Sequence, residues 1–442
     1  SACPVVMSSS METLKEYAPA ELLALYMDEA RALNVPTCDR LCTLLTDASE
    51  REAPLSQLNL KRAAVGRSGA APLAALLEHD SYLTYVNLEE NGLGDDGAAQ
   101  VADALLTHQS LFRLDLGYNG IGKGGVKAVA ALVAASPSLL CLDLSGNSLS
   151  TRLAAFVPVV PASMSTLAPL GKALEKDTCR LQLLHLDHAD VEHKGLASLV
   201  DGLLNNTTLV NLRVGENALE LRAAQTLGRL LRANKTLTNL DLRDNALSDA
   251  GAAAIASALC ENAGLRCLVL WSNGIGPDGI AALAEPLRAN TTLQILDIGG
   301  NAVGARGLLP LKDSLHHNGT LHTLGLANAA LGEEGGIAVA EVLEGSASLQ
   351  RLDLRRNQLQ VAGLMALNLS MKSNHSLIEV ALDAAADPAA DAQARQLHET
   401  FQEEIRAACA RNAGAAAGKP APPRHGPSAM DLLSQLGMPG LG

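Results

Sequence analysis

The feature of this sequence that most constrains its fold is a leucine pattern that returns every 28 residues. The pattern reads L-x-x-L-x-L-x-x-N-x-L, and its phase is constant except for one longer step of 42 residues after Leu139. Such a fixed period predicts a solenoid, in which each repeat packs only against its neighbours. The twelve starts, of which the last is only a strand, are Leu55, Leu83, Leu111, Leu139, Leu181, Leu209, Leu237, Leu265, Leu293, Leu321, Leu349 and Leu377.

The letters of one repeat predict a strand, a turn and a helix. In "LTNLDLRDNAL", residues 237–247, apolar residues alternate and therefore point to one side of a short strand. Gly251 then opens "AAAIASALCEN", whose apolar spacing of three and four predicts a helix. Between them, the amide of Asn245 can satisfy backbone groups where the chain leaves the strand. The Asn slot recurs at Asn91, Asn119, Asn147, Asn217, Asn273, Asn301 and Asn357, and it holds Ala at Ala63, Ala189 and Ala329.

These repeats resemble leucine-rich repeats of the ribonuclease-inhibitor type, which share the 28-residue period and the N-x-(L/I)-G-x-x-G segment. "LDLRDNALSDAGAAAIASALCEN", residues 240–262, is also similar to the repeats of NOD-like receptors. The resemblance covers about residues 55–385. It implies an α/β horseshoe with parallel strands on the concave face and helices on the convex face, while for function it implies only binding.

The net charge and the cysteine content argue against several classes of function. A net charge of −13 disfavours binding to nucleic acid or to anionic membranes. No basic run interleaved with aromatic residues, no signal peptide and no membrane-spanning stretch is present, and the eight scattered cysteines form no zinc-like doublet. Thiols in this arrangement are typical of a cytoplasmic protein, which includes one associated with the cytoskeleton or a cilium.

The chain divides into a solenoid between two helical caps. The step of 42 residues indicates an insertion near residues 150–164, which either folds against its own repeat or docks a partner. The last residues, "SAMDLLSQLGMPGLG", are either an amphipathic docking motif or a disordered tail. We expect a disordered N-terminus at 1–11, a helical cap at 12–54, the solenoid at 55–385, a helical cap at 386–412, and a flexible linker with the tail motif at 413–442.

The sequence contains one group of residues that could bind a metal and no catalytic motif. The sequence contains no P-loop, nucleophile elbow, H-E-x-x-H helix or EF-hand loop, so we expect no catalytic residue, no metal and no cofactor. In "HLDH", His185 and His188 are expected beside Asp143 and Glu216 on neighbouring strands, where they would either bind a metal or form solvated ion pairs.

The predicted concave face is the candidate binding surface for a partner protein. Trp271, the only Trp of the chain, either anchors an interface or lies flat over its neighbours. An Asp recurs between the second and third leucines of the pattern. These aspartates either contribute to binding a partner or are required by the repeat itself. The residues predicted to contact a partner are Tyr85, Glu89, Tyr118, Asp143, His185, Asp187, Glu216, Asp241, Trp271, Arg351, Arg355 and Arg356.

The sequence therefore predicts a non-catalytic scaffold or adaptor that binds a partner protein through its concave face. The 150–164 loop or the C-terminal tail would supply a second contact. The alternative is a GTPase-activating protein of the Ran-activating type, which uses a similar horseshoe. Those proteins carry a strongly acidic C-terminal stretch, whereas the tail here is rich in Ala, Gly and Pro.

Overall fold

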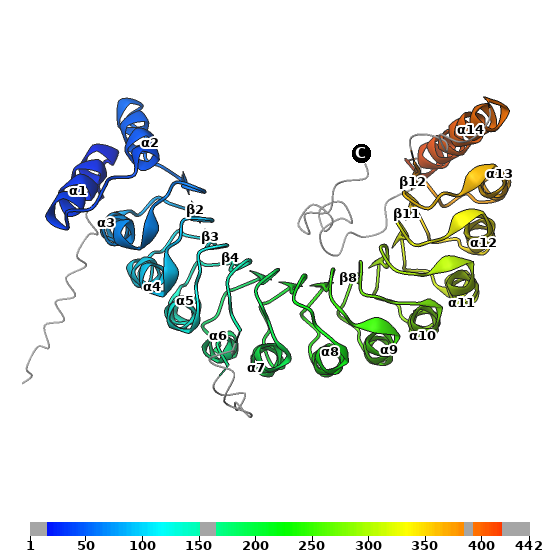
Figure 1. Ribbon diagram of the computed structural model, residues 1–442, viewed down its shortest axis with the longest axis horizontal. Helices are drawn as coiled ribbons and strands as arrows, with labels where there is room; N and C mark the ends of the chain where they lie inside the picture. Colours follow the sequence, from blue (N-terminus) through cyan, green and yellow to red (C-terminus); the bar gives the residue numbers. More distant parts are fainter. Residues whose placement is uncertain (1–15, 151–164, 384–391, 418–442) are drawn as a thin grey trace, which may run out of the picture.

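The protein is an open arc of alternating strands and helices in a computed structural model that describes residues 16–150, 165–383 and 392–417. Strands line the inner side of the arc and helices line the outer side (Figure 1). The predicted horseshoe, with strands on the concave face and helices on the convex face, is confirmed. The predicted loop at 150–164, the N-terminus at 1–11 and the tail motif lie almost wholly outside the described residues.

The strands form one parallel sheet of twelve strands in chain order. Each residue pairs with the residue 28 positions later, as Leu212 does with Leu240, except that Leu142 of β4 pairs with Leu184 of β5 across the step of 42. The sheet register therefore follows the sequence period. The strands are β1 Gln57–Asn59, β2 Tyr85–Asn87, β3 Arg113–Asp115, β4 Cys141–Asp143, β5 Leu183–His185, β6 Asn211–Arg213, β7 Asn239–Asp241, β8 Cys267–Val269, β9 Ile295–Asp297, β10 Thr323–Gly325, β11 Arg351–Asp353 and β12 Glu379–Ala381.

One helix follows each strand, and each helix packs on the helices of the two neighbouring layers. Helix α6, beside the insertion, is the shortest of those that the structure describes, with 7 residues. The helices between strands are α3 Gly66–His79, α4 Gly94–Ala104, α5 Lys123–Ala135, α6 Ala168–Leu174, α7 His193–Leu203, α8 Leu221–Ala233, α9 Ser248–Leu259, α10 Pro277–Leu287, α11 Gly304–His317, α12 Gly332–Gly345 and α13 Gln360–Ser370.

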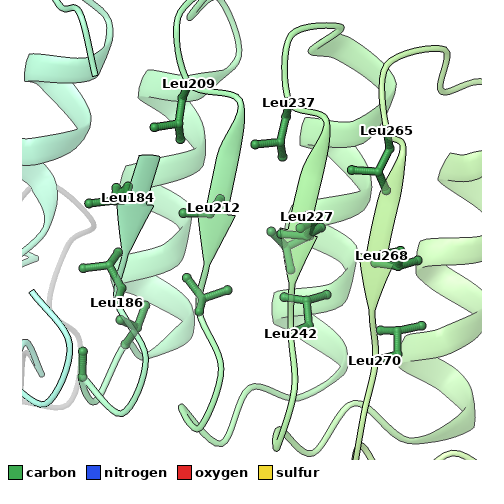
Figure 2. Close-up of a cluster of buried hydrophobic side chains, with 14 of the residues drawn as sticks. Leu184, Leu186, Leu209, Leu212, Leu227, Leu237, Leu242, Leu265, Leu268 and Leu270 are labelled. Carbon is green, nitrogen blue, oxygen red and sulfur yellow. The ribbon is translucent and has the colours of Figure 1, made fainter. Parts of the chain in front are cut away.

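The core between sheet and helices consists of rows of leucines that repeat from layer to layer. Leu209, Leu237 and Leu265 occupy one such row, and each is at most 2% exposed (Figure 2). Burying one leucine fully contributes roughly 1.5–3 kcal/mol. Because every layer repeats the same set, the apolar stabilisation is spread evenly along the arc instead of being concentrated at one centre.

An asparagine ladder joins the layers where the chain leaves each strand. The Asn119 side-chain amide donates to the carbonyl oxygens of Leu88, Leu116 and Gly117 at 2.8–3.0 Å. Its Oδ1 accepts from the backbone N–H groups of Asn91 and Leu93 in the preceding layer. The predicted role of this slot is confirmed. Ala63, Ala189 and Ala329 supply no such amide, so the layer before Ala189 and the layer before Ala329 lack this bridge.

A second series of asparagines closes the C-terminal ends of the helices. The Asn234 amide donates to the carbonyl oxygens of Leu203 and Asn206, and its Oδ1 accepts from the N–H groups of Thr236 and Leu237. These residues satisfy helix carbonyls that lack an intrahelical partner. The equivalent residues are Asn206, Asn262, Asn290, Asn318 and Asn374.

Helices flank the sheet at both ends. Helix α1, Pro19–Ala32, packs against α2, Asp39–Glu50, and against α3. Helix α14, Ala392–Ala417, packs against α13 and β12, and its Asn412 amide donates to the carbonyls of Asn374 and Leu377. Helix α14 extends past residue 412, where we placed the boundary with the linker, because the alanines there have the highest helix propensity.

We expect Asn119→Ala to lower the free energy of unfolding by several kcal/mol. The substitution leaves the buried N–H groups of Asn91 and Leu93 without an acceptor, at roughly 1–3 kcal/mol for each group, whereas the carbonyls that the amide contacts keep other donors. Urea unfolding followed by circular dichroism measures this. The control is Gln225→Ala on the exposed side of α8, which should change stability little. Equal stability of both variants would contradict the role assigned to the ladder.

Candidate functional site

The concave face consists of the first and third residues of each strand and the residues two and three positions beyond its end. The leucines between these positions point into the core, so these side chains point away from it. All twelve residues predicted to contact a partner occupy positions on this face. They are not equally accessible, and most are engaged in contacts with neighbouring layers.

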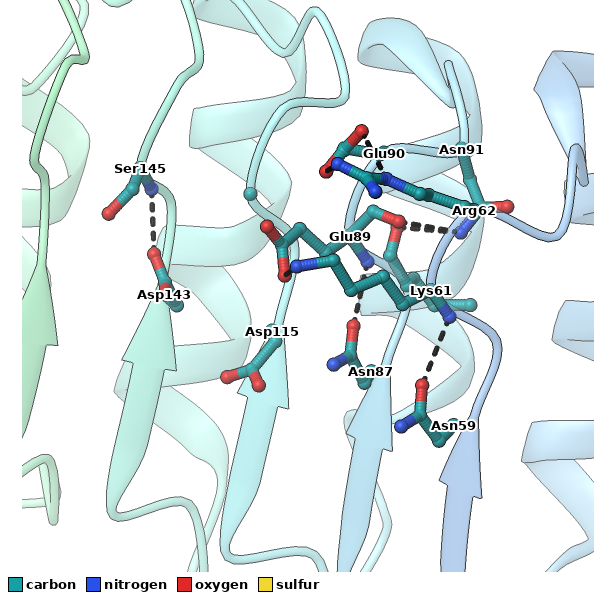
Figure 3. A network of polar contacts seen from close by, with 12 residues as sticks. Asn59, Lys61, Arg62, Asn87, Glu89, Glu90, Asn91, Asp115, Asp143 and Ser145 are labelled. Atoms are coloured by element: carbon teal, nitrogen blue, oxygen red, sulfur yellow. Dashed lines mark hydrogen bonds and ion pairs between the residues drawn. The ribbon is translucent and has the colours of Figure 1, made fainter. Parts of the chain in front are cut away.

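Ion pairs between adjacent layers hold the N-terminal part of the face. Lys61 Nζ lies 2.7 Å from Glu89 Oε2, and Arg62 donates two hydrogen bonds of 2.7 Å to Glu90 (Figure 3). The guanidinium holds the pKa of Glu90 below its usual range. Such exposed pairs contribute little to stability because solvent screens them, but they restrict the side chains to defined positions.

Tyr85 belongs to the same part of the face and is half-buried. Its hydroxyl donates to Asp115 Oδ2 at 2.7 Å, and the Arg113 guanidinium lies 5.1 Å from its ring. Burial and the bond to Asp115 raise the pKa of Tyr85 to about 12. The Tyr85 hydroxyl is therefore protonated, and it already donates its hydrogen bond within the sheet.

The acids in the middle strand slot have a structural task. Asp143, Asp241 and Asp297 each accept a hydrogen bond from the backbone N–H two residues later, at 2.8–3.0 Å. Asn59 and Asn87 make the same bond in the first two layers (Figure 3). This Asx-type turn ends the strand. These contacts explain the aspartates as a requirement of the repeat, and they give no reason to assign them to partner binding.

The cluster considered for metal binding consists of paired groups. His185 Nδ1 lies 3.8 Å from Asp143 Oδ2, and His188 Nδ1 lies 3.5 Å from Glu216 Oε2. Burial opposes ionisation of Asp143, but hydrogen bonds from His185 and Ser145 outweigh it and hold its pKa below the usual range. Across residues 16–150, 165–383 and 392–417 no group of three or more His, Cys, Asp and Glu is placed to hold a metal ion.

Two aromatic residues lie flat over glycines of the next layer. The Trp271 ring covers Gly299 and Gly300, where a methyl group on Gly299 would overlap it. The Tyr118 ring covers Gly146 in the same way and stacks on the His188 ring at 6.2 Å between centroids. Trp271 is half-buried, whereas Tyr118 is 48% exposed. Tyr118 therefore offers the more accessible aromatic surface, and the flat orientation considered for Trp271 is the one observed.

Asp241 requires a correction, because it lies on the concave face but is fully buried. Arg243, two residues later, folds back over it and donates to both carboxylate oxygens. Arg213 also approaches this carboxylate from the neighbouring layer, and it pairs with Asp187 at 2.5 Å. Asp241 thus orders two arginines and is not itself available to a partner.

The three arginines predicted to contact a partner near the C-terminal end of the face are interleaved with acids. Arg351 pairs with Glu379 at 2.8 Å, and Arg355 donates to both oxygens of Asp353. Arg356 is the exposed member of the three. The sequence placed these arginines correctly on the face, but the carboxylates between them reduce the local positive potential.

The centre of the face carries buried apolar residues at three strand positions, and none of them was predicted to contact a partner. Cys267, Val269 and Ile295 occupy strand positions on the concave side, and each is at most 1% exposed. Burial raises the pKa of the neighbouring Asp297 to about 6, although the Gly299 N–H partly offsets this. The only feature of the sequence that could have indicated this buried apolar centre was the lack of charged residues at these three positions.

Comparison with known proteins agrees with this architecture. Six segments match a family model described as leucine-rich repeat, at residues 79–102, 107–130, 233–256, 261–284, 289–312 and 345–367. The chain contains leucine-rich repeats. Its fold, an open parallel sheet with alternating helices, is a leucine-rich-repeat solenoid.

Among solved structures, the chain is similar to the leucine-rich repeat-containing protein LegL7 from Legionella pneumophila. The two are 17% identical, with a TM-score of 0.44, and the match covers 69% of this chain and 94% of that one. No curated protein matches the sequence significantly. In the described ranges, no helix combines the length and apolar character needed to cross a membrane.

Asp297→Asn should stabilise the protein increasingly as the pH rises from 4 to 8. The folded pKa of about 6 exceeds the ordinary value of 3.8, so between them the folded state binds more protons than the unfolded state. Wild-type stability from this group is present below pH 4 and is lost as the pH rises through 6. The gain for the variant at pH 8 is at most about 3 kcal/mol.

Thermal unfolding of both proteins at each pH measures the difference. Asp244→Asn is the control, because that carboxylate is exposed and its removal should give no such trend. A stability difference for Asp297→Asn that is the same at pH 4 and pH 8 would show that the buried carboxylate is charged in the folded protein without cost.

Proposed function

We propose that this chain is a non-catalytic protein–protein interaction scaffold or adaptor that binds a partner protein through its concave face. Leucine-rich repeats usually mediate such interactions. The observation that carries the proposal is the cluster of Tyr118, His188 and Glu216, whose side chains are exposed and held by stacking and pairing. An exposed aromatic ring that is already fixed in place loses little entropy on binding and is a favoured interface anchor.

The charges along the concave face bear on the chemistry of the partner. Glu89 and Glu90 follow β2, toward the N-terminal end of the arc, whereas Arg355 and Arg356 follow β11, toward its C-terminal end (Figure 1). Most of these groups are already paired within the sheet. A partner surface of mixed charge with apolar positions fits this face better than a polyanion, which a chain of net charge −13 would repel.

The repeat type, the cellular location and the second contact are proposed from the sequence. The 28-residue period supports repeats of the ribonuclease-inhibitor type, similar to those of NOD-like receptors. Seven cysteines in the described ranges are free thiols, which supports a cytoplasmic location, including a cytoskeletal or ciliary one. We further propose that binding needs no metal or cofactor, and that the 150–164 loop or the tail adds a second contact.

The test is affinity purification from cell extract with the full chain as bait. We expect the bait carrying Tyr118→Ala and Glu216→Lys to lose the partner, because both substitutions lie within the exposed cluster. The matched control carries Leu309→Ala and Asp103→Lys, which change exposed residues of helices on the convex side and should leave binding intact. Titration calorimetry with the purified partner then measures the loss.

Two results would overturn this proposal. A partner retained by the concave variant but lost by the convex control would move the binding surface to the helices. A small GTPase in the eluate that hydrolyses GTP faster when the chain is added would favour the alternative of a GTPase-activating protein.

A further inference from the structure

Exposed apolar side chains form a row on the convex side, near the C-terminal end of the arc. The row has one residue on each of α11, α12 and α13, and each residue follows the first residue of its helix by five positions (Figure 1). Leu309 is 59% exposed, Ile337 is 41% exposed and Met365 is 48% exposed. Because these three helices pack side by side, residues at the same helix position lie in a line across them. We call these three residues the convex row.

The repeat itself does not require large apolar side chains at this position. In the two preceding layers the same position holds Ala253 and Ala281. Charged groups flank the row, because Lys312 of α11 pairs with Glu341 of α12 at 2.7 Å beside it. An exposed group of large apolar side chains with a polar rim marks a surface that another segment covers.

The chain continues after α14 with a segment whose apolar residues have a matching spacing. In residues 428–442, Met430, Leu433 and Leu436 follow one another at intervals of three. In the polyproline II conformation every third side chain points to the same side, about 9 Å further along. The axes of packed helices lie about 8–10 Å apart. A segment that crosses α13, α12 and α11 in this conformation therefore places one of these side chains on each helix.

The segment is close enough to reach the convex row of its own chain. Helix α14 runs alongside α13 in the same direction, and its Arg411 donates to the carbonyl oxygen of Met371. Ala417 lies six residues beyond Arg411, and Met365 lies six residues before Met371, each about 9 Å of helix. With the spacing between the two axes, Ala417 and Met365 are about 20 Å apart. Residues 418–429 span up to about 40 Å when extended, which is sufficient.

We propose that the convex row is the docking site of the chain's own C-terminal segment, residues 428–442. Met430 contacts Met365, and the two leucines that follow at intervals of three contact the row on α12 and α11. A tether of this length gives a local concentration of about 1 mM, so docking within one chain is favoured over docking between two chains. The docking does not rest on the proposed function, because the convex row lies on the other side of the arc from the concave face.

Binding of a labelled peptide of residues 428–442, followed by fluorescence anisotropy, tests this docking. The full chain carrying Met430→Ser, Leu433→Ser and Leu436→Ser, which we call the open variant, leaves the row uncovered. It should bind the peptide with a dissociation constant below about 1 mM, the local concentration of the tethered segment. The wild-type chain should bind the peptide more weakly, by a factor of about 10 if that constant is about 0.1 mM, because its own segment competes.

A second variant locates the contact on the protein. In the open variant, the row is removed by three further substitutions, Leu309→Ser, Ile337→Ser and Met365→Ser. This row variant should lose the peptide. Its matched control replaces three similarly exposed apolar residues outside the row and should keep the peptide, with Met27→Ser, Leu33→Ser and Leu221→Ser. Circular dichroism verifies that all variants unfold at the wild-type temperature, as expected for exposed positions.

A pair of peptides locates the contact on the segment. The peptide with serine at the three positions that are changed in the open variant should not bind. Its matched control loses the same number of Met and Leu residues but keeps the spacing of three, and it should bind as the unmodified peptide does. The control carries Leu432→Ser, Met438→Ser and Leu441→Ser.

Three results would overturn the proposal. Equal binding of the peptide by the open variant and the row variant would place the site elsewhere. Equal binding by the wild type and the open variant would show that the chain's own segment does not occupy the row. A wild-type mass that rises with concentration in sedimentation velocity, but not for the open variant, would replace docking within one chain by docking between two. Because no partner is used, failure to find one leaves these measurements unaffected.

Discussion

The buried asparagine in each layer is the interaction on which the structure depends. A strand of three residues followed by a turn leaves backbone groups that neither the sheet nor the helix can pair. The amide of Asn119 pairs such groups in its own layer and in the layer before it. Because this bridge fixes each layer relative to the next, the same strand register and the same leucine rows recur along the arc.

The curvature follows from the unequal widths of the two sides. Neighbouring strands lie about 4.8 Å apart, whereas packed helices need about 8–10 Å. Adding layers therefore bends the sheet inward and crowds the side chains at the centre of the concave face. This crowding brings arginines such as Arg243 onto acids such as Asp241, and it sets the Trp271 ring against Gly299. The face is consequently a pre-organised surface with few freely rotating side chains.

The sequence was sufficient for the fold, because period and pattern recur in every layer. Leucine spacing placed the strands, and the Asn slot predicted the ladder. The site was only partly predictable, because exposure depends on what lies in the neighbouring layers. Asp241 has an outward position, yet Arg243 covers it. For Trp271 a signal did exist, since the residue one period later is Gly299, which leaves room for a ring to lie flat.

The buried apolar residues at the centre of the concave face could not be predicted from the pattern. Cys267, Val269 and Ile295 look like ordinary variation at positions where any residue is tolerated. Their common property emerges only when the register sets them side by side on β8 and β9. Repeats specify a scaffold through what is constant, while recognition resides in what varies between repeats. A periodic analysis therefore detects the scaffold more readily than the binding surface.

The two internal layers with Ala in the ladder slot also determine how the chain comes apart. In a linear array the free energy is a sum of units and nearest-neighbour interfaces, so opening begins at the weakest interface. Ala189 and Ala329 remove the amide bridge between β4 and β5 and between β9 and β10. We therefore expect opening to begin at these two interfaces, which flank a middle segment, β5–β9, that includes Trp271 and the buried apolar residues of β8 and β9. Local opening at these interfaces would let one segment fray while its neighbours remain folded.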